Sequence, residues 1–144
     1  MALTQTSARN QYVGTVVAVR EGAVNGVVTI DLGGPLIKAD ITMESIHALG
    51  ITEGAAATAV VNPTSVFFAP GTARLALSAR NQYAGTVTAI ERGAVNGCVH
   101  LTTPEDLTFV GSLELEAIDE LGLCAGSPAV AIVKSTDVMV GAPV

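Results

Sequence analysis

Short runs of hydrophobic and β-branched residues recur along this chain, and glycine, proline and asparagine separate them. In the first half such runs cover residues 12–20, 27–32 and 36–41, with Gly22-Ala23-Val24-Asn25-Gly26 and Gly33-Gly34-Pro35 between them. β-Branched runs bounded by turn residues indicate antiparallel strands. The Asn25-Gly26 pair tolerates positive φ at low cost and favours a tight hairpin between the first two strands.

The hydrophobic spacing changes after the third run. Residues 43–49 have helical spacing, with Thr42 as a suitable N-cap and Gly50 as a suitable stop signal. The apolar stretch 57–68 then predicts one final strand, interrupted at Asn62-Pro63-Thr64. The pattern therefore predicts a small module of strands with one short helix.

The same pattern occurs a second time, 71 residues later. Of the 22 positions from Ser7 to Val28, 16 are identical to their counterparts from Ser78 to Val99. Later segments match with a slip of one residue, and we expect the extra residue between Thr102 and Val110. The Pro70-Gly71 pair marks a turn or linker between the two copies. The chain is therefore an internal duplication.

The duplication sets the domain organisation and limits the fold. We expect a first module at residues 1–70 and a second at residues 71–144. A module of about five strands is too small for a sandwich and closes most naturally as an OB-like barrel. We therefore predict an all-β chain of two tandem OB-like five-stranded β-barrels, with one short helix per module. Modules this small are marginally stable alone, so self-association is expected.

The charge and composition exclude several classes of partner. A net charge of -6 and few aromatic residues argue against a nucleic-acid surface, which needs basic stripes and stacking platforms. No apolar run reaches the roughly 18 residues of a membrane span, and residues 1–10 lack the features of a secretion signal. We expect a cytoplasmic protein that binds neither nucleic acid nor membranes. A small dianion can still bind, because a local donor cluster outweighs the screened net charge at short range.

The cysteines and histidines suggest no metal site. Cys98 and Cys124 lie in apolar stretches without CxxC spacing, so we expect both to be small core residues. His47 and His100 have no second ligand at metal spacing, and a surface or packing role is expected for both. No Ser/His/Asp or Cys/His set indicates catalysis.

The most informative motif is Ser-Ala-Arg-Asn, which occurs at 7–10 and again at 78–81, directly before an apolar strand. A tetrahedral oxyanion needs donors that converge from several directions. This motif offers a hydroxyl, a guanidinium, a carboxamide and consecutive backbone N–H groups. The alternative is that Ser and Asn shape a turn while Arg lies on the solvated surface. Duplication favours the binding interpretation, although a shared structural role would also be repeated.

A second polar segment, Lys134-Ser135-Thr136, adds an ammonium and two hydroxyls to an otherwise apolar strand. The first copy has Asn62-Pro63-Thr64 at these positions and has lost the cation. Any site on the first copy is therefore expected to be weaker or differently composed. The alternative is an ordinary break in an edge strand, with the lysine in water.

Together these motifs resemble the molybdate-binding Mop (TOBE) module. Ser-Ala-Arg-Asn-Gln is followed by Gly-Thr-Val, Gly-Ala-Val-Asn-Gly, a Leu-Gly helix end and a Lys-Ser-Thr-x-Val-Met-Val-Gly tail. The order is right and the pattern occurs twice, so nearly the whole chain resembles the duplicated di-Mop molbindins of the ModG type. The resemblance implies OB-like barrels, a homotrimer, and molybdate or tungstate bound at interfaces between modules and subunits.

The resemblance also implies which residues bind the oxyanion. They are Ser7, Ala8, Arg9, Asn10, Ser78, Ala79, Arg80, Asn81, Lys134, Ser135, Thr42 and Thr64. Ala8 and Ala79 would act through their backbone N–H groups. Thr42 matches a threonine that is supplied across an interface in the family, whereas the second copy has Glu114 there. A carboxylate facing a dianion is unfavourable, so this contribution is expected to be absent from the second copy or turned away.

The predicted function is reversible molybdate binding for intracellular molybdenum storage and homeostasis, without catalysis. One alternative is a ligand-sensing regulatory module, since the same unit occurs joined to DNA-binding or transport-ATPase domains in related proteins. No helix-turn-helix segment or nucleotide loop precedes Ser7, so that role would need a separate transcription or transport partner. An enzyme or a purely structural oligomer is the third interpretation, and the missing catalytic set argues against an enzyme.

Overall fold

The structure, a computed structural model, describes residues 10–143 and divides into two compact units. Among these residues, unit 1 combines 10–61 with 134–143, and unit 2 spans Asn62–Val133. Each unit contains one five-stranded antiparallel sheet and one short α-helix. The predicted all-β class with one helix per module is therefore confirmed.

Unit 1 has the strand order β10-β4-β1-β2-β3. Its elements are β1 (Asn10–Arg20), β2 (Asn25–Asp31), β3 (Leu36–Thr42), α1 (Met43–Ala48), β4 (Ala56–Val61), the 3-10 turn η2 (Ser135–Asp137) and β10 (Met139–Gly141). At one edge of the sheet, β3 also contacts β10 and η2, which belong to the opposite edge. The sheet therefore curls around a core that includes Val16, Val28, Ile30 and Ile37, all fully buried.

Unit 2 repeats this arrangement in the order β5-β9-β6-β7-β8. Its elements are the 3-10 turn η1 (Pro63–Ser65), β5 (Phe67–Pro70), β6 (Asn81–Arg92), β7 (Asn96–Thr102), β8 (Thr108–Glu114), α2 (Leu115–Glu120) and β9 (Pro128–Val133). Here η1 contacts β8. The core includes Val87, Val99, Leu101 and Phe109, which are buried as completely as their counterparts in unit 1.

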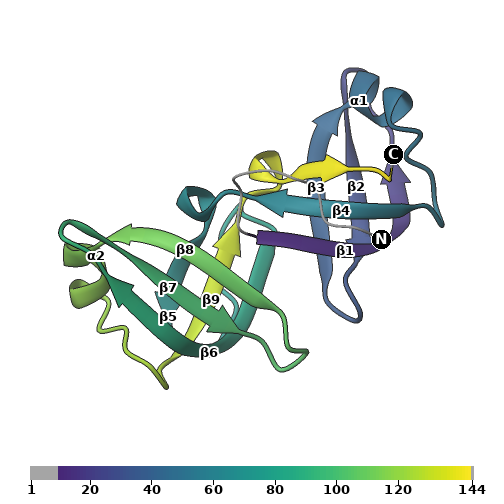
Figure 1. Cartoon of the computed structure of the whole chain (residues 1–144). Helices are drawn as coiled ribbons and strands as arrows, with labels where there is room; N and C mark the ends of the chain where they lie inside the picture. Colours follow the sequence, from purple (N-terminus) through teal and green to yellow (C-terminus); the bar gives the residue numbers. More distant parts are fainter. Residues whose placement is uncertain (1–9, 144) are drawn as a thin grey trace. The chain divides into compact units, whose positions relative to one another are not determined.

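In each unit, one edge strand comes from the other copy of the sequence repeat. β10 pairs with β4 in unit 1, where Figure 1 shows it in yellow beside that strand, and β5 pairs with β9 in unit 2. The expected single strand over 57–68 is therefore wrong. β4 ends at Val61 and η1 redirects the chain, because Pro63 has no N–H to continue a ladder. Modules 1–70 and 71–144 describe the sequence repeat, whereas the compact units cross that boundary.

Gly26, the second residue of β2, does not form the turn that was expected there. Asn25 and Gly26 are already paired with Thr42 and Ile41 of β3, and residues 21–24 make the connection. The predicted hairpin between β1 and β2 is confirmed, but the prediction that Asn25-Gly26 forms its turn is wrong. A Cβ on Gly26 would lie 2.7 Å from the Ile46 side chain, so this glycine allows α1 to pack closely on β2.

Other local predictions hold. The Thr42 side chain accepts a hydrogen bond from the Ser45 N–H, as an N-cap does, and Gly50 has a φ of 63° just past the helix end. The extra residue of the second copy lies in the loop 103–107, which is one residue longer than loop 32–35 and contains Asp106 at a φ of 69°. Within the described residues, no helix has the length and hydrophobicity needed to cross a membrane.

Candidate functional site

The second Ser-Ala-Arg-Asn motif lies directly before β6, and Asn81 is the first residue of that strand. The first motif begins outside the described residues, so the structure says nothing of Ser7, Ala8 and Arg9, and the description starts at Asn10. The structure therefore describes the expected donor segment in full only at residues 78–81.

The two asparagines anchor the strands and do not project into solvent. Asn10 is 2% exposed and donates from Nδ2 to the Val61 carbonyl at 3.2 Å, while its Oδ1 accepts from the Tyr12 hydroxyl at 3.2 Å. Asn81 is 3% exposed and accepts from the Tyr83 hydroxyl at 3.5 Å. A buried carboxamide with such partners fixes the start of its strand. These side chains therefore fix the first residues of β1 and β6.

Gln82 shapes the segment that carries the motif. Its Nε2 donates to the carbonyls of Leu75 and Ala79 at 2.9 and 3.1 Å, and its Oε1 accepts from the Leu75 N–H at 2.7 Å. One side chain thus ties both ends of the stretch 75–79 to β6. This role of Gln82 was not predicted from the sequence, although the identity of Gln11 and Gln82 in the repeat was a signal for it.

Arg80 carries the motif's exposed positive charge. Its carbonyl accepts from the Arg74 guanidinium at 3.0 Å, which helps to fix the backbone. Within residues 10–143, the Arg80 guanidinium itself forms no hydrogen bond or ion pair. The residue before it, Ala79, is buried against Val130 and Ile132 of β9. The structure therefore presents an unneutralised guanidinium on a well-anchored backbone.

Tyr83 supports the same strand from inside the unit. Its ring stacks on Phe109 with centroids 4.5 Å apart, and burial raises the pKa of its hydroxyl well above the usual range, which the nearby Arg74 charge partly opposes. The hydroxyl therefore stays protonated at neutral pH and can keep donating to Asn81.

Lys134 lies one residue beyond the end of β9. Val133, the last residue of that strand, is the register partner of Asn81, and Lys134 directly follows it. Lys134 is exposed, and its ammonium has no hydrogen-bond or ion-pair partner in the described part of the chain. Ser135, at the first position of η2, is half-buried.

The corresponding segment of the first copy is neutral. Asn10 and Val61 are partners in the β1–β4 register, and Asn62, Pro63 and Thr64 follow Val61. Thr64 is exposed in η1. Both predicted late segments therefore occupy equivalent places, one with a cation and one without.

Thr42 has a local role that the donor prediction did not include. Its hydroxyl donates to the Ser45 Oγ at 2.9 Å and also accepts from the Ser45 N–H at 3.1 Å. Its counterpart Glu114 precedes α2 without a capping hydrogen bond, and its side chain is exposed. The α1 end of unit 1 is therefore neutral at this position, whereas the α2 end of unit 2 carries a carboxylate.

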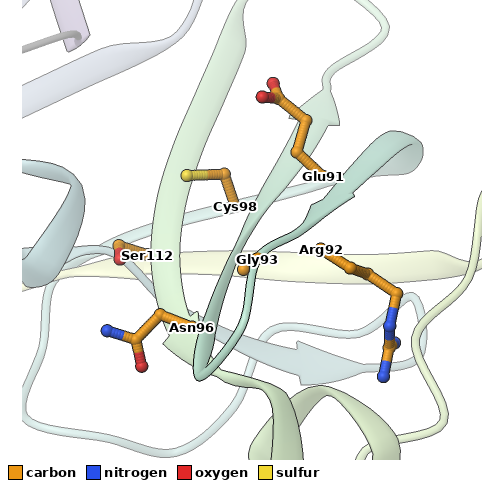
Figure 2. A pocket seen from close by; sticks show the side chains of 7 residues that line it. Glu91, Arg92, Gly93, Asn96, Cys98 and Ser112 are labelled. Carbon is orange, nitrogen blue, oxygen red and sulfur yellow. The ribbon is translucent and has the colours of Figure 1, made fainter.

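Two equivalent hollows lie beside the connections that precede β2 and β7. The hollow in unit 2 has a volume of about 280 Å³ and its lining includes Arg92, Asn96, Cys98 and Ser112 (Figure 2). The hollow in unit 1 measures about 150 Å³, and there the Asn25 amide donates to the Asp40 carboxylate at 3.0 Å. The shorter Ser112 at the Asp40 position leaves the second hollow larger.

The cysteines differ from their predicted core positions. Cys98 is half-buried in the wall of the unit 2 hollow, and Cys124 is exposed, with its Sγ 3.2 Å from the Ser127 Oγ. Strand alternation explains the partial exposure of Cys98, because its neighbours Gly97 and Val99 lie on the buried face of β7. His100 lies 2.6 Å from a Glu91 carboxylate oxygen. Over residues 10–143, no group of three or more His, Cys, Asp or Glu side chains is arranged to hold a metal ion.

The fold and the repeated donor segments define a tandem β-module protein. The family model described as the TOBE domain matches residues 6–68 and 77–140, and the chain therefore belongs to the TOBE-domain family, with two tandem copies. The resemblance inferred from the motifs is confirmed.

Two known proteins are similar in sequence to most of the chain. The molybdenum transport protein ModE of Herbaspirillum seropedicae is 39% identical over 137 residues, covering 94% of this chain and 51% of that protein. The molybdenum-pterin-binding protein MopA of Rhodobacter capsulatus is 32% identical over 140 residues, covering 96% and 53%. The chain thus spans about half the length of these relatives.

A solved structure matches the whole architecture. It is the cytoplasmic molybdate-binding protein ModG with molybdate bound, which is 40% identical, with a TM-score of 0.92, over 97% of this chain and 100% of that one. This likeness confirms the prediction of two tandem OB-like modules.

Proposed function

We propose that this chain binds molybdate or tungstate reversibly, without catalysis, and serves molybdenum storage and homeostasis in the cytoplasm. The observation that carries the proposal is the unneutralised guanidinium of Arg80, which lies on the backbone that Gln82 and Asn81 hold at the start of β6. The relatives named for molybdenum transport or binding, and ModG with its bound molybdate, support the choice of ligand.

The proposed donors are those of the two repeated motifs and of the two late segments, together with Thr42. Their guanidinium, ammonium and backbone N–H groups can only donate, and their hydroxyls can donate as well, which suits a full dianion. Hydrogen phosphate would have to donate its own proton and would find few acceptors among them, so the site should disfavour it. We propose that Asn10 and Asn81 contribute mainly by holding the backbone at which these donors are mounted.

We further propose that the sites are completed in a homotrimer, by donors from neighbouring modules. Single β-modules of this size bury little surface alone, which favours association. A ligand shared between subunits would also stabilise the assembly, because it binds the assembled form preferentially.

The test is calorimetric titration of the full chain with molybdate, tungstate, sulfate and phosphate, together with a solution mass measurement. We expect heat and saturation with molybdate and tungstate, and little with phosphate. Arg80→Ala should weaken molybdate binding by about tenfold or more, the cost of losing a hydrogen bond to a charged group. Arg20→Ala is the matched control, because Arg20 lies at the far end of β1. Absence of molybdate binding, or equal weakening by both substitutions, would contradict the proposal.

A further inference from the structure

Arg74 lies in the exposed loop that leads to the second donor motif, outside the motif itself. Its guanidinium donates to the Arg80 carbonyl at 3.0 Å. Within residues 10–143, Arg74 forms no other hydrogen bond and no ion pair, so its positive charge is unneutralised. The residue 71 positions earlier is Leu3, so the sequence repeat gives no signal for this contact.

The backbone beside Arg74 is held in place, although the side chain is exposed. The Leu75 N–H donates to the Gln82 Oε1 at 2.7 Å, and the Leu75 carbonyl accepts from the Gln82 Nε2 at 2.9 Å. The Leu77 N–H also donates to the Leu75 carbonyl at 3.0 Å, which folds the loop back on itself. Arg74 therefore reaches Arg80 from a fixed point, and less conformational entropy is lost when its side chain is ordered.

The hydrogen bond from Arg74 acts directly on the donor motif. A carbonyl oxygen carries partial negative charge and repels a nearby anion, and donation from a guanidinium offsets that charge. The bond also restrains the backbone from which the Arg80 side chain extends. Because Ala79 and Asn81 are buried on either side of it, Arg80 has little backbone freedom left once its carbonyl is held.

The charge of Arg74 lies close enough to β6 to act on a buried group of that strand. Burial raises the pKa of the Tyr83 hydroxyl, and the positive charge of Arg74 partly opposes this effect. Arg74 and Arg80 thus place two cations on one short segment, and neither is paired with a carboxylate in the part of the chain that the structure describes. Holding two like charges together costs free energy, which a bound anion would offset.

We infer that Arg74 is a positioning residue for oxyanion binding at the second motif, where it holds the Arg80 carbonyl and adds a positive charge. This inference rests on the proposed function and deepens it. Both effects favour the bound anion, because the hydrogen bond orders the donors in advance and the charge attracts the dianion.

The experiment is titration of the full chain with sodium molybdate, comparing the unmodified chain with four variants. Arg74→Leu introduces the residue of the first copy, Arg74→Gln keeps an N–H donor without the charge, and Arg74→Lys keeps both a donor and the charge. Arg92→Leu is the matched control, because it removes the same charge at the far end of β6, where Arg92 pairs with Asp119.

We expect Arg74→Leu to weaken molybdate binding roughly 2-fold to 10-fold, the range for one net hydrogen bond. Arg74→Gln should bind more weakly than the unmodified chain, and Arg74→Lys should recover most of the affinity. The loss in Arg74→Leu should also shrink between about 0.01 M and about 1 M salt, because salt screens an exposed charge. A purely structural defect would not depend on salt in this way.

Unchanged affinity in Arg74→Leu, full affinity in Arg74→Gln, or an equal loss in Arg92→Leu would overturn the inference and leave molybdate binding intact. Absence of any bound molybdate in the unmodified chain would instead remove the proposed function, and the inference with it.

Discussion

The ring of Phe68 occupies the space that a side chain at Gly111 would need. A Cβ on Gly111 would collide with Phe68 Cε2 and would also lie 3.0 Å from the Val66 carbonyl oxygen. The equivalent positions in unit 1 are Ala39 and Val140, a larger receiving residue with a smaller exchanged one. The volumes of the exchanged strand and the receiving sheet are therefore matched within each unit.

This match predicts a steric cost for Gly111→Ala. Gly111 has no positive φ, so the cost should come from the collision alone, at about 1–3 kcal/mol for an overpacked core. The free energy of unfolding from denaturant titration measures it. Phe68→Val in the same chain reproduces the unit 1 pair and should recover most of the loss. Simple additivity of the two single substitutions would show that the residues do not compete for space.

Gln82→Ala should loosen the segment before β6. The substitution removes all three hydrogen bonds that hold Leu75 and Ala79 to the strand, so this exposed stretch should open more often. We expect trypsin to cleave after Arg74 several-fold faster than in the unmodified chain. Thr72→Ala, in the same exposed linker, is the control. Unchanged cleavage in Gln82→Ala would mean that these bonds do not restrain the segment.

Tyr83 should destabilise the fold in alkali. Its pKa is raised by burial, so the native state keeps the proton while the unfolded tyrosine ionises near its ordinary value of about 10. The neutral hydroxyl's contribution is complete below that pH and is lost as the pH rises toward the native pKa. Relative to Tyr83→Phe, the unmodified chain should lose about 1.4 kcal/mol per pH unit above about 10. An equal difference at pH 8 and pH 11, from denaturant titration, would contradict this.

Asp31 should have the opposite dependence in acid. The backbone N–H groups of Gly34 and Gly33 donate to its carboxylate at 2.9 Å and lower its pKa. Its stabilising effect is therefore present above the unfolded pKa of about 3.9 and is lost as the pH falls through the lower native value. The Tm difference between the unmodified chain and Asp31→Asn should shrink from pH 6 to pH 2. Glu53→Gln, in an exposed turn, provides the comparison.

The sequence located most of the elements because their signals are local. The β-branched runs, the Thr42 cap and the stop at Gly50 depend on neighbours within a few residues, and the structure reproduces them with small shifts at the ends. The prediction of a turn at Asn25-Gly26 was wrong, because Gly26 lies within β2 and packs closely against α1. Likewise, the buried roles of Asn10 and Asn81 depend on partners in distant strands.

By itself, the sequence determined that the chain is a tandem duplication of a small β-module with two repeated donor motifs, since identity at a fixed spacing needs no structure to be seen. Only the tertiary structure decided that β5 and β10 each pair with a strand of the other repeat. The two repeats have nearly identical pairing patterns, so β4 and β9 could each accept either strand. The choice depends on contacts between residues far apart in the chain, such as Phe68 and Gly111.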